Sequence, residues 1–187
     1  IKNAKIIKHV RNDGFRRSPF PNAKNNLNDE VIAAAQKTIT NWPGYTHTPL
    51  ISLKTTAAAC GVRAIYYKDE SHRFGLKSFK ALGGAYAVAQ LVNEEEKAGR
   101  DPSKLTVTTA TDGNHGRSVS WGAQLVGCRA EIYIHKHVSA AREVAMAEYG
   151  ANVTRVNGNY EASLAACKAD AASHGWHIIS DTSWDGY

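Results

Sequence analysis

The chain has 187 residues, of which 43% are hydrophobic and 21% charged, and these values are ordinary for a soluble globular protein. No apolar stretch approaches the length that spans a bilayer, and Ile1–Arg11 lacks the apolar core and cleavage site of a signal peptide, so we expect a cytoplasmic protein without a membrane partner. The net charge of +6 comes from dispersed Lys and Arg residues without an interleaved aromatic pattern, which argues against a nucleic-acid partner.

The first 80 residues are irregular and rich in Asn, Pro and Thr. One helix is predicted over Asp29–Thr40, because Asn28 suits the N-cap and two acidic residues follow it at the positive end of the helix dipole. The segment Thr48–Leu50 is predicted to be a turn or extended, since it surrounds a proline. Ala64–Lys68 has the composition of a strand.

From Ser78 onward, helical and strand patterns alternate. The predicted helices are Phe79–Ala98, Arg117–Val126, Ser139–Tyr149 and Tyr160–His174. The predicted strands are Leu105–Ala110, Ala130–His135, Asn152–Val156 and Trp176–Ser180. This alternation predicts an α/β fold, a parallel sheet with helices on both faces. Ligands of such sheets bind beyond the carboxyl ends of the strands, which selects the loops 68–80, 111–116 and 181–187.

The first of these loops ends at Lys80. A lysine can form a Schiff base with an aldehyde cofactor when its amine is partly desolvated. Lys80 has apolar neighbours, stands at the start of a predicted helix and precedes Gly83-Gly84, which would let a flat ring approach the backbone closely. The alternative is an ordinary surface lysine.

The second loop, Thr111–Gly116, joins a strand end to a helix start. Backbone N–H groups at such a position can hold an anion or polar ring substituents. Asn114 can donate and accept hydrogen bonds, and Asp112 is a potential proton acceptor. The spacing of Gly113 and Gly116 does not match a dinucleotide-binding motif. A turn in which Asp112 or Asn114 caps the helix is the alternative.

The third loop begins at Asp181, which could bind a cationic group of a substrate or merely cap a turn. The histidines show no metal-ligand spacing, so no catalytic metal is expected. The three cysteines, Cys60, Cys128 and Cys167, lie far apart without CxxC spacing, which favours reduced thiols over a disulfide framework or a zinc site.

Two of these motifs together carry a resemblance. Ser78-Phe79-Lys80 with its following glycines, and then Asp112–Gly116 on a strand–helix turn, resemble the fold-type II pyridoxal phosphate (PLP) enzymes, such as threonine dehydratase, serine dehydratase and the tryptophan synthase β chain. Further segments look like one family among them, diaminopropionate ammonia-lyase: Lys68–Ser71, Arg73–Leu76, Thr109–Arg117 and Asp181–Tyr187. The likeness covers nearly the whole chain from about Asn41 and is weaker before it.

The resemblance implies a role for each residue of the cofactor site. Lys80 would hold pyridoxal 5'-phosphate as a Schiff base, and Phe79 would lie beside the cofactor ring. Asn114 would hydrogen-bond the ring hydroxyl, and Gly113 and His115 belong to the same cofactor-binding turn.

It also implies an activity, the PLP-dependent α,β-elimination of the small amino acid 2,3-diaminopropionate to pyruvate and ammonia. Asp112 stands where the broader dehydratase group usually has a small residue, and in the ammonia-lyase it is an acid/base residue facing the substrate. Asp181 corresponds to a second acidic residue near the substrate. Carboxylates would attract the extra ammonium of diaminopropionate. Lys80 and Asp112, acting as bases on opposite faces, would let both enantiomers react.

The implied domain organisation is an N-terminal part of the large PLP-binding domain over residues 1–80 and a small α/β domain over residues 81–187. The family binds the cofactor phosphate with a Gly-rich loop downstream of the equivalent of Tyr187, and no such run occurs here. We therefore expect the chain to be the N-terminal half of the enzyme, without the rest of the large domain, and to bind PLP poorly by itself. The full-length enzyme is expected to be a homodimer.

Two other functions stay open. Another fold-type II lyase, such as a serine or threonine dehydratase, is disfavoured by Asp112 and Asp181, and a substrate panel would decide. A non-catalytic α/β binding module would be excluded by a yellow protein that borohydride reduction labels at Lys80.

Overall fold

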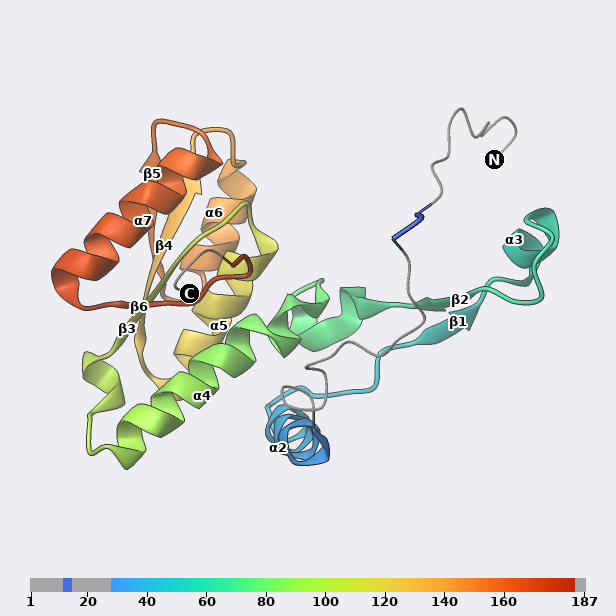
Figure 1. The fold of residues 1–187 in the computed structure, drawn as a ribbon, viewed down its shortest axis with the longest axis horizontal. Coiled ribbons are helices and arrows are strands. Elements are labelled where there is room, and N and C mark those ends of the chain that lie inside the picture. The colour runs from blue at the N-terminus through green and yellow to red at the C-terminus, as the bar shows by residue number, and fades with distance from the viewer. Residues whose placement is uncertain (1–11, 15–27, 184–187) are drawn as a thin grey trace. The chain divides into compact units, whose positions relative to one another are not determined.

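The computed structural model describes residues 12–14 and 28–183 (Figure 1). The chain divides into two compact units, Ile1–Gln36 and Lys37–Tyr187, and each is described by itself. Helix α2 (Asp29–Thr40) has the bounds that the sequence predicts. The Asn28 side chain accepts a hydrogen bond from the Val31 N–H at 2.9 Å, which confirms Asn28 as the N-cap.

Two short strands form an antiparallel ribbon in the second unit. Strand β1 (Leu50–Ser52) pairs with β2 (Tyr66–Lys68), and helix α3 (Lys54–Ala59) lies in the connection between them. The segment that the sequence predicts as turn or extended therefore leads into a strand. The predicted strand Ala64–Lys68 is shorter at its start, because its pairing with β1 begins only at Tyr66.

A buried polar cluster fixes the chain just after β2. Short helix η1 (Glu70–Gly75) carries Glu70, which accepts a hydrogen bond from the Arg73 Nε at 2.9 Å. Thr48 donates to the other Glu70 oxygen at 2.7 Å and accepts from Arg73 at 3.2 Å. Because each member of the cluster is satisfied by the others, the guanidinium can be buried without an unpaired charge. The cluster anchors the loop that leads to Lys80.

Four parallel strands form the main sheet in the order β5-β4-β3-β6. The strands are β3 (Thr106–Ala110), β4 (Arg129–His135), β5 (Asn152–Val156) and β6 (His177–Ile178). The longer helices around them are α4 (Gly84–Lys97), α5 (Asn114–Val126), α6 (Ala140–Ala147) and α7 (Tyr160–His174). A short turn, η3 (Pro102–Lys104), precedes β3. The predicted α/β fold with a parallel sheet is confirmed.

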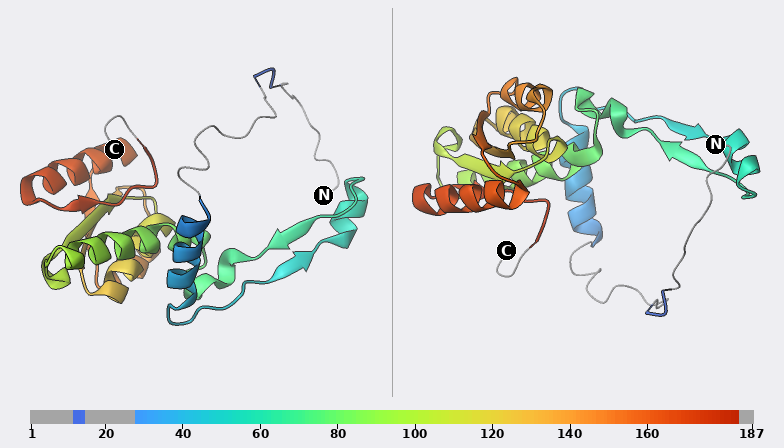
Figure 2. Two further views of the ribbon diagram at one scale, coloured as in Figure 1. Left: turned by 60° about the horizontal axis from the view of Figure 1, so that its bottom comes forward. Right: turned by 90° about the horizontal axis from the view of Figure 1, so that it is seen from above.

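The alternation of side chains along the strands separates two apolar layers. Val107 and Ile132 point to the face where Val88 of α4, Val119 of α5 and Met146 of α6 complete the largest apolar cluster. The neighbouring residues Ala110 and Tyr133 point to the other face, where they pack against Cys167 of α7. Figure 2 shows α7 on one side of the sheet and α4 and α5 on the other.

The predicted helix Phe79–Ala98 is interrupted near its start. A short 3-10 turn, η2 (Phe79–Leu82), comes first, and α4 begins only at Gly84. Gly84 lies against α5, where a Cβ atom would come within 2.6 Å of the Ser118 Oγ. The interruption therefore holds Lys80 in a separate turn beside the start of α5.

Within the described part of the chain, no helix is long and apolar enough to cross a membrane.

Candidate active site

Hydrogen bonds from two sides hold the turn that carries Lys80. Ser78 caps the turn by accepting a hydrogen bond from the Lys80 N–H at 3.2 Å. From α5, Ser118 donates to the Lys80 carbonyl at 2.8 Å and accepts from the Ala85 N–H at 3.0 Å. The position of the Lys80 backbone is thus tied to α5, the helix that begins at the second predicted loop.

Thr111 organises that second loop. Its Oγ1 accepts hydrogen bonds from the N–H groups of Gly113 and Gly116, at 3.0 and 3.1 Å. Gly113 has φ +154° and ψ −78°, and a Cβ atom there would lie 3.0 Å from the Cδ of Arg142. Glycine is therefore required both by the backbone conformation and by the packing of an arginine against the loop. Asn114 is exposed at the first turn of α5.

The Lys80 amine forms an ion pair with Asp181, although 101 residues separate them in sequence. Lys80 Nζ donates to Asp181 Oδ2 at 2.8 Å, and both side chains are about two-thirds buried. Burial raises the pKa of the Asp181 carboxyl, but the hydrogen bond from Lys80 and the neighbouring His115 outweigh burial, so the net pKa lies below its ordinary value. Asp181 is therefore a carboxylate at neutral pH, suited to hold a cation.

His115 fixes the end of β6 to α5. Its Nε2 donates to the carbonyl of Ile179 at 2.8 Å, and the ring is buried. This bond places Asp181, two residues further along the chain, beside Lys80. The sequence assigned His115 to the cofactor-binding turn, and the structure gives it a contact that aligns the third loop with the first.

One cavity of ≈ 350 Å³ brings nearly all the predicted site residues together. Its walls include Lys80, Asp112, Gly113, Asn114, His115 and Asp181. Its volume lies within the range of about 300–1,000 Å³ that is usual for small-molecule sites. All three loops that the sequence selected contribute to it.

Phe79 lies apart from this cavity. It lines an adjoining cavity of ≈ 290 Å³, together with Gly83 and Gly84. Lys80, His115 and Asp181 line both cavities. The Lys80 Nζ is 5.7 Å from the centre of the Phe79 ring, which is 58% exposed. The more apolar cavity therefore adjoins the polar one at the Lys80 amine.

Four polar residues of the first cavity were not predicted as site residues: Thr111 and Thr182 lie in the selected loops, whereas Arg142 and Tyr160 lie outside them. Arg142 belongs to the first turn of α6 and donates to the Asp112 carbonyl at 3.1 Å. Burial raises the pKa of the Tyr160 hydroxyl and outweighs a hydrogen bond with Thr182 that lowers it; Asp181 and Asp112 raise the pKa further, so this hydroxyl stays protonated at neutral pH. Both residues begin helices that follow parallel strands, and the rule that selected the loops could have found them.

Comparisons with known proteins identify the class. A family model described as "Pyridoxal-phosphate dependent enzyme" matches residues 42–187, and the chain belongs to this family. The chain is similar to the diaminopropionate ammonia-lyase of Escherichia coli strain K12, with 42% identity over 155 residues, which cover 77% of this chain and 39% of that protein. The chain thus spans less than half the length of the curated relatives it matches.

Solved structures agree with the sequence comparison. A structure of the Escherichia coli diaminopropionate ammonia-lyase in complex with an aminoacrylate–PLP azomethine reaction intermediate has a TM-score of 0.84 at 38% identity, and covers 95% of this chain and 46% of that one. The same enzyme in complex with D-serine has a TM-score of 0.80 at 38% identity, and covers 85% of this chain and 44% of that one. The expected fold type and cofactor class are confirmed.

The first cavity fits PLP by its chemistry. Lys80 supplies a primary amine, Asn114 an amide, and the start of α5 supplies main-chain N–H groups beside the cavity. In residues 12–14 and 28–183, no group of three or more His, Cys, Asp or Glu side chains could hold a metal ion.

Proposed function

We propose that the full-length protein eliminates the β-amino group of 2,3-diaminopropionate, yielding pyruvate and two molecules of ammonia with the uptake of one water. The observation that carries the proposal is the cavity in which the Lys80 amine is paired with Asp181 and whose wall also includes Asp112. Carboxylates in the cavity suit diaminopropionate, because they attract the extra ammonium that this substrate carries. The similarity to diaminopropionate ammonia-lyase supports the same substrate.

The cofactor would be held by residues from two of the three loops. Lys80 would bind it through the Nζ amine, and Asn114, Gly113 and His115 would border it. Phe79 would lie on the apolar side of the same amine. PLP, when bound, withdraws electrons from the substrate and so makes its Cα proton acidic.

The protein's own residues would then move the protons. The Asp112 carboxylate would accept the Cα proton from one face of the substrate, and the Lys80 Nζ would accept it from the other, so that each enantiomer has its own base. Asp181 would hold an ammonium of the substrate. The protonated Tyr160 hydroxyl stands in the same cavity and would give a proton to the β-amino group when that group is neutral, so that it leaves as ammonia.

A substrate panel with matched variants tests this function in the full-length protein. We expect pyruvate from both enantiomers of diaminopropionate and much slower release from serine and threonine. Asp112→Asn should lower the turnover of one enantiomer by about 10²-fold or more, because a general base contributes on that scale. Its absorbance from the Schiff base should persist, whereas Lys80→Ala should abolish that absorbance.

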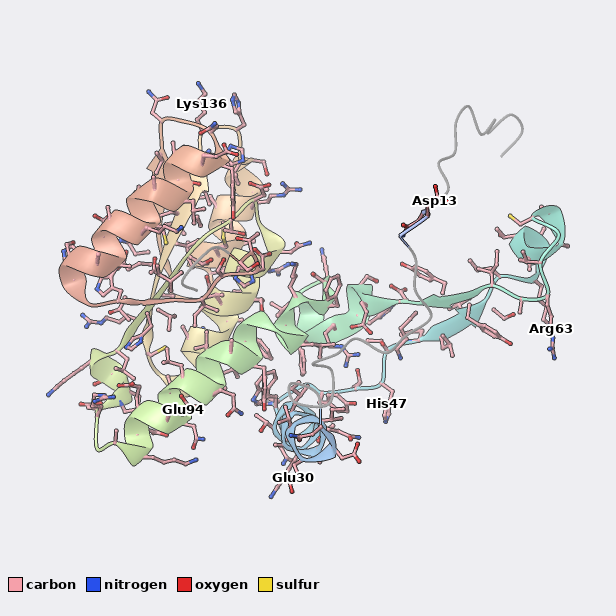
Figure 3. All side chains as sticks on the ribbon, in the orientation of Figure 1. Asp13, Glu30, His47, Arg63, Glu94 and Lys136 are labelled. Atoms are coloured by element: carbon pink, nitrogen blue, oxygen red, sulfur yellow. The ribbon has the colours of Figure 1, made fainter. Side chains whose placement is uncertain are left out.

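Glu94→Gln is the control. It makes the same change from carboxylate to amide on an exposed residue of α4, which Figure 3 labels. Asp112→Asn activity equal to the control with both enantiomers would refute the assigned role of Asp112. Faster turnover of serine or threonine would instead favour a dehydratase.

The domain organisation and the assembly are part of the proposal. We infer that residues 1–80 belong to a larger PLP-binding domain and residues 81–187 to the small α/β domain, and that the full-length protein is a homodimer. Light scattering on the full-length protein tests the assembly.

A further inference from the structure

The side chains of Asp112 and His135 form a pair that the proposed reaction has not used. His135 Nε2 lies 2.9 Å from Asp112 Oδ1. The sheet register brings them together, because β3 and β4 are parallel and Ala110 is paired with Tyr133. Two residues beyond that pair, Asp112 follows the end of β3 and His135 is the last residue of β4. The register of β3 with β4 therefore brings the Asp112 and His135 side chains within contact distance.

The proton in this pair can be assigned from a second hydrogen bond. The His135 Nδ1 accepts the backbone N–H of His137 at 3.2 Å, so this nitrogen carries no proton. A neutral imidazole then carries its proton on Nε2, which must donate to Asp112. The two ring nitrogens of His135 thus have different partners, the His137 N–H at Nδ1 and the Asp112 carboxyl at Nε2.

Both the side chain and the main-chain carbonyl of Asp112 therefore have a hydrogen-bond partner. Its side chain is 67% exposed, whereas that of His135 is only 17% exposed, so the more enclosed ring is the fixed partner of the accessible carboxylate. On the main chain, Arg142 donates to the Asp112 carbonyl at 3.1 Å. A surface carboxylate would otherwise move among several rotamers. The two contacts reduce that freedom at the cavity wall.

Other charged or titratable groups surround the pair. They come from the segment after β4, from β5, from the first turns of α6 and α7, and from the other two loops of the cavity, and they include His137, Arg155, Arg142, Tyr160, Lys80 and Asp181. The ring of His137 lies beside that of His135, with ring centres 5.9 Å apart.

We propose that His135 is a positioning residue that keeps the Asp112 side chain oriented as the proton acceptor for one face of the substrate. The proposal rests on the proposed function of Asp112. Its consequence is asymmetric, because only the enantiomer whose Cα proton goes to Asp112 depends on His135. The enantiomer whose proton goes to Lys80 does not.

Three substitutions in the full-length, PLP-loaded protein test this role. His135→Phe keeps a flat ring but removes the donor, and should lower kcat for the Asp112-dependent enantiomer by about 10- to 100-fold, the scale of a lost hydrogen bond to a charged group. KM and the turnover of the other enantiomer should stay near their original values. His135→Gln, which retains an N–H donor, should recover part of the loss. His174→Phe, at an exposed histidine of α7 outside the cavity, should leave both rates unchanged.

Equal losses for both enantiomers, or no loss for either, would overturn the proposal. Asp112→Asn separates it from the proposed function. If Asp112→Asn suppresses one enantiomer and His135→Phe does not, only the role of His135 is wrong. If Asp112→Asn suppresses neither, the proposed function of Asp112 fails and the role of His135 fails with it.

Imidazole nitrogen NMR gives a readout that does not depend on activity. In PLP-free full-length protein with ¹⁵N-labelled histidine, the His135 signals can be assigned by their loss in His135→Gln. We expect the tautomer protonated at Nε2 at neutral pH, and a shift of the Nε2 resonance in Asp112→Ala. A ring protonated at Nδ1, or an Nε2 resonance whose position is unchanged in Asp112→Ala, would show that the pair does not exist in solution.

Discussion

Gly122 of α5 sets how closely α4 approaches the helix that begins at the active-site loop. A Cβ atom at this position would lie 2.7 Å from the Cα and 3.0 Å from the Cβ of Ala85. Carbon atoms in contact prefer separations of about 3.5–4.0 Å, so the substitution Gly122→Ala must push α4 away by roughly 1 Å. The nearest atom belongs to the backbone, and no change of rotamer can relieve the contact.

Two opposing effects determine the stability of this variant. Alanine in a helix interior is favoured over glycine by about 1 kcal/mol. Overpacking of a well-packed interior costs about 1–3 kcal/mol and occasionally more. The Ala85 contact is severe, so the upper part of that range applies and the variant should lose about 1–2 kcal/mol. Lys80 lies only five residues before Ala85, and a displacement near 1 Å at a reactive group can cost about 10²-fold in rate.

Thermal unfolding of the PLP-free full-length protein measures the loss of stability. Pyruvate release by the PLP-loaded protein measures the loss of rate that a displaced Lys80 would cause. Gln124→Ala is the matched control, because it places alanine at an exposed position of the same helix and should change stability by less than about 0.5 kcal/mol. A Gly122→Ala variant that is more stable than the original protein, by the amount of the helix propensity, would refute the packing argument.

Two further predictions concern ionisation. The hydrogen bond from Arg73 holds the pKa of Glu70 below its ordinary 4.5, so the stabilisation from ionised Glu70 is present above that pH and is lost as pH falls through the lower folded-state value. Acid should thus lower the Tm of the original protein more than that of Glu70→Gln, and parallel Tm–pH curves would contradict this. Burial raises the pKa of Cys128 to about 11 and also raises that of Cys167, whereas Cys60 is exposed. Iodoacetamide at mildly alkaline pH should alkylate Cys60 first, and peptide mass spectrometry would reveal any faster labelling of the other two.

Local sequence patterns were sufficient to predict most of the helices and strands in the second half of the chain. Short apolar runs between helical patterns indicate strands of a covered parallel sheet, and β3 and β4 lie where such runs were predicted. The edge strand β5 also lies where it was predicted, although its residues are exposed or half-buried. The same patterns were weaker before Lys80. Helix α3 was missed, and β1 was anticipated only as a turn or extended segment, because strands of three residues are stabilised by their partner and not by their own composition.

The sequence by itself determined which loops carry the site, since the carboxyl ends of parallel strands gather at one edge. It could not determine which side chains meet there. The contact between Lys80 and Asp181 requires β6 to lie next to β3, and the contact between Asp112 and His135 requires the register of β3 with β4. Strand order and register are set by packing across the whole sheet, between residues far apart in the chain. The tertiary structure therefore decided the partners of each charged group, and with them the roles proposed for Lys80 and Asp112.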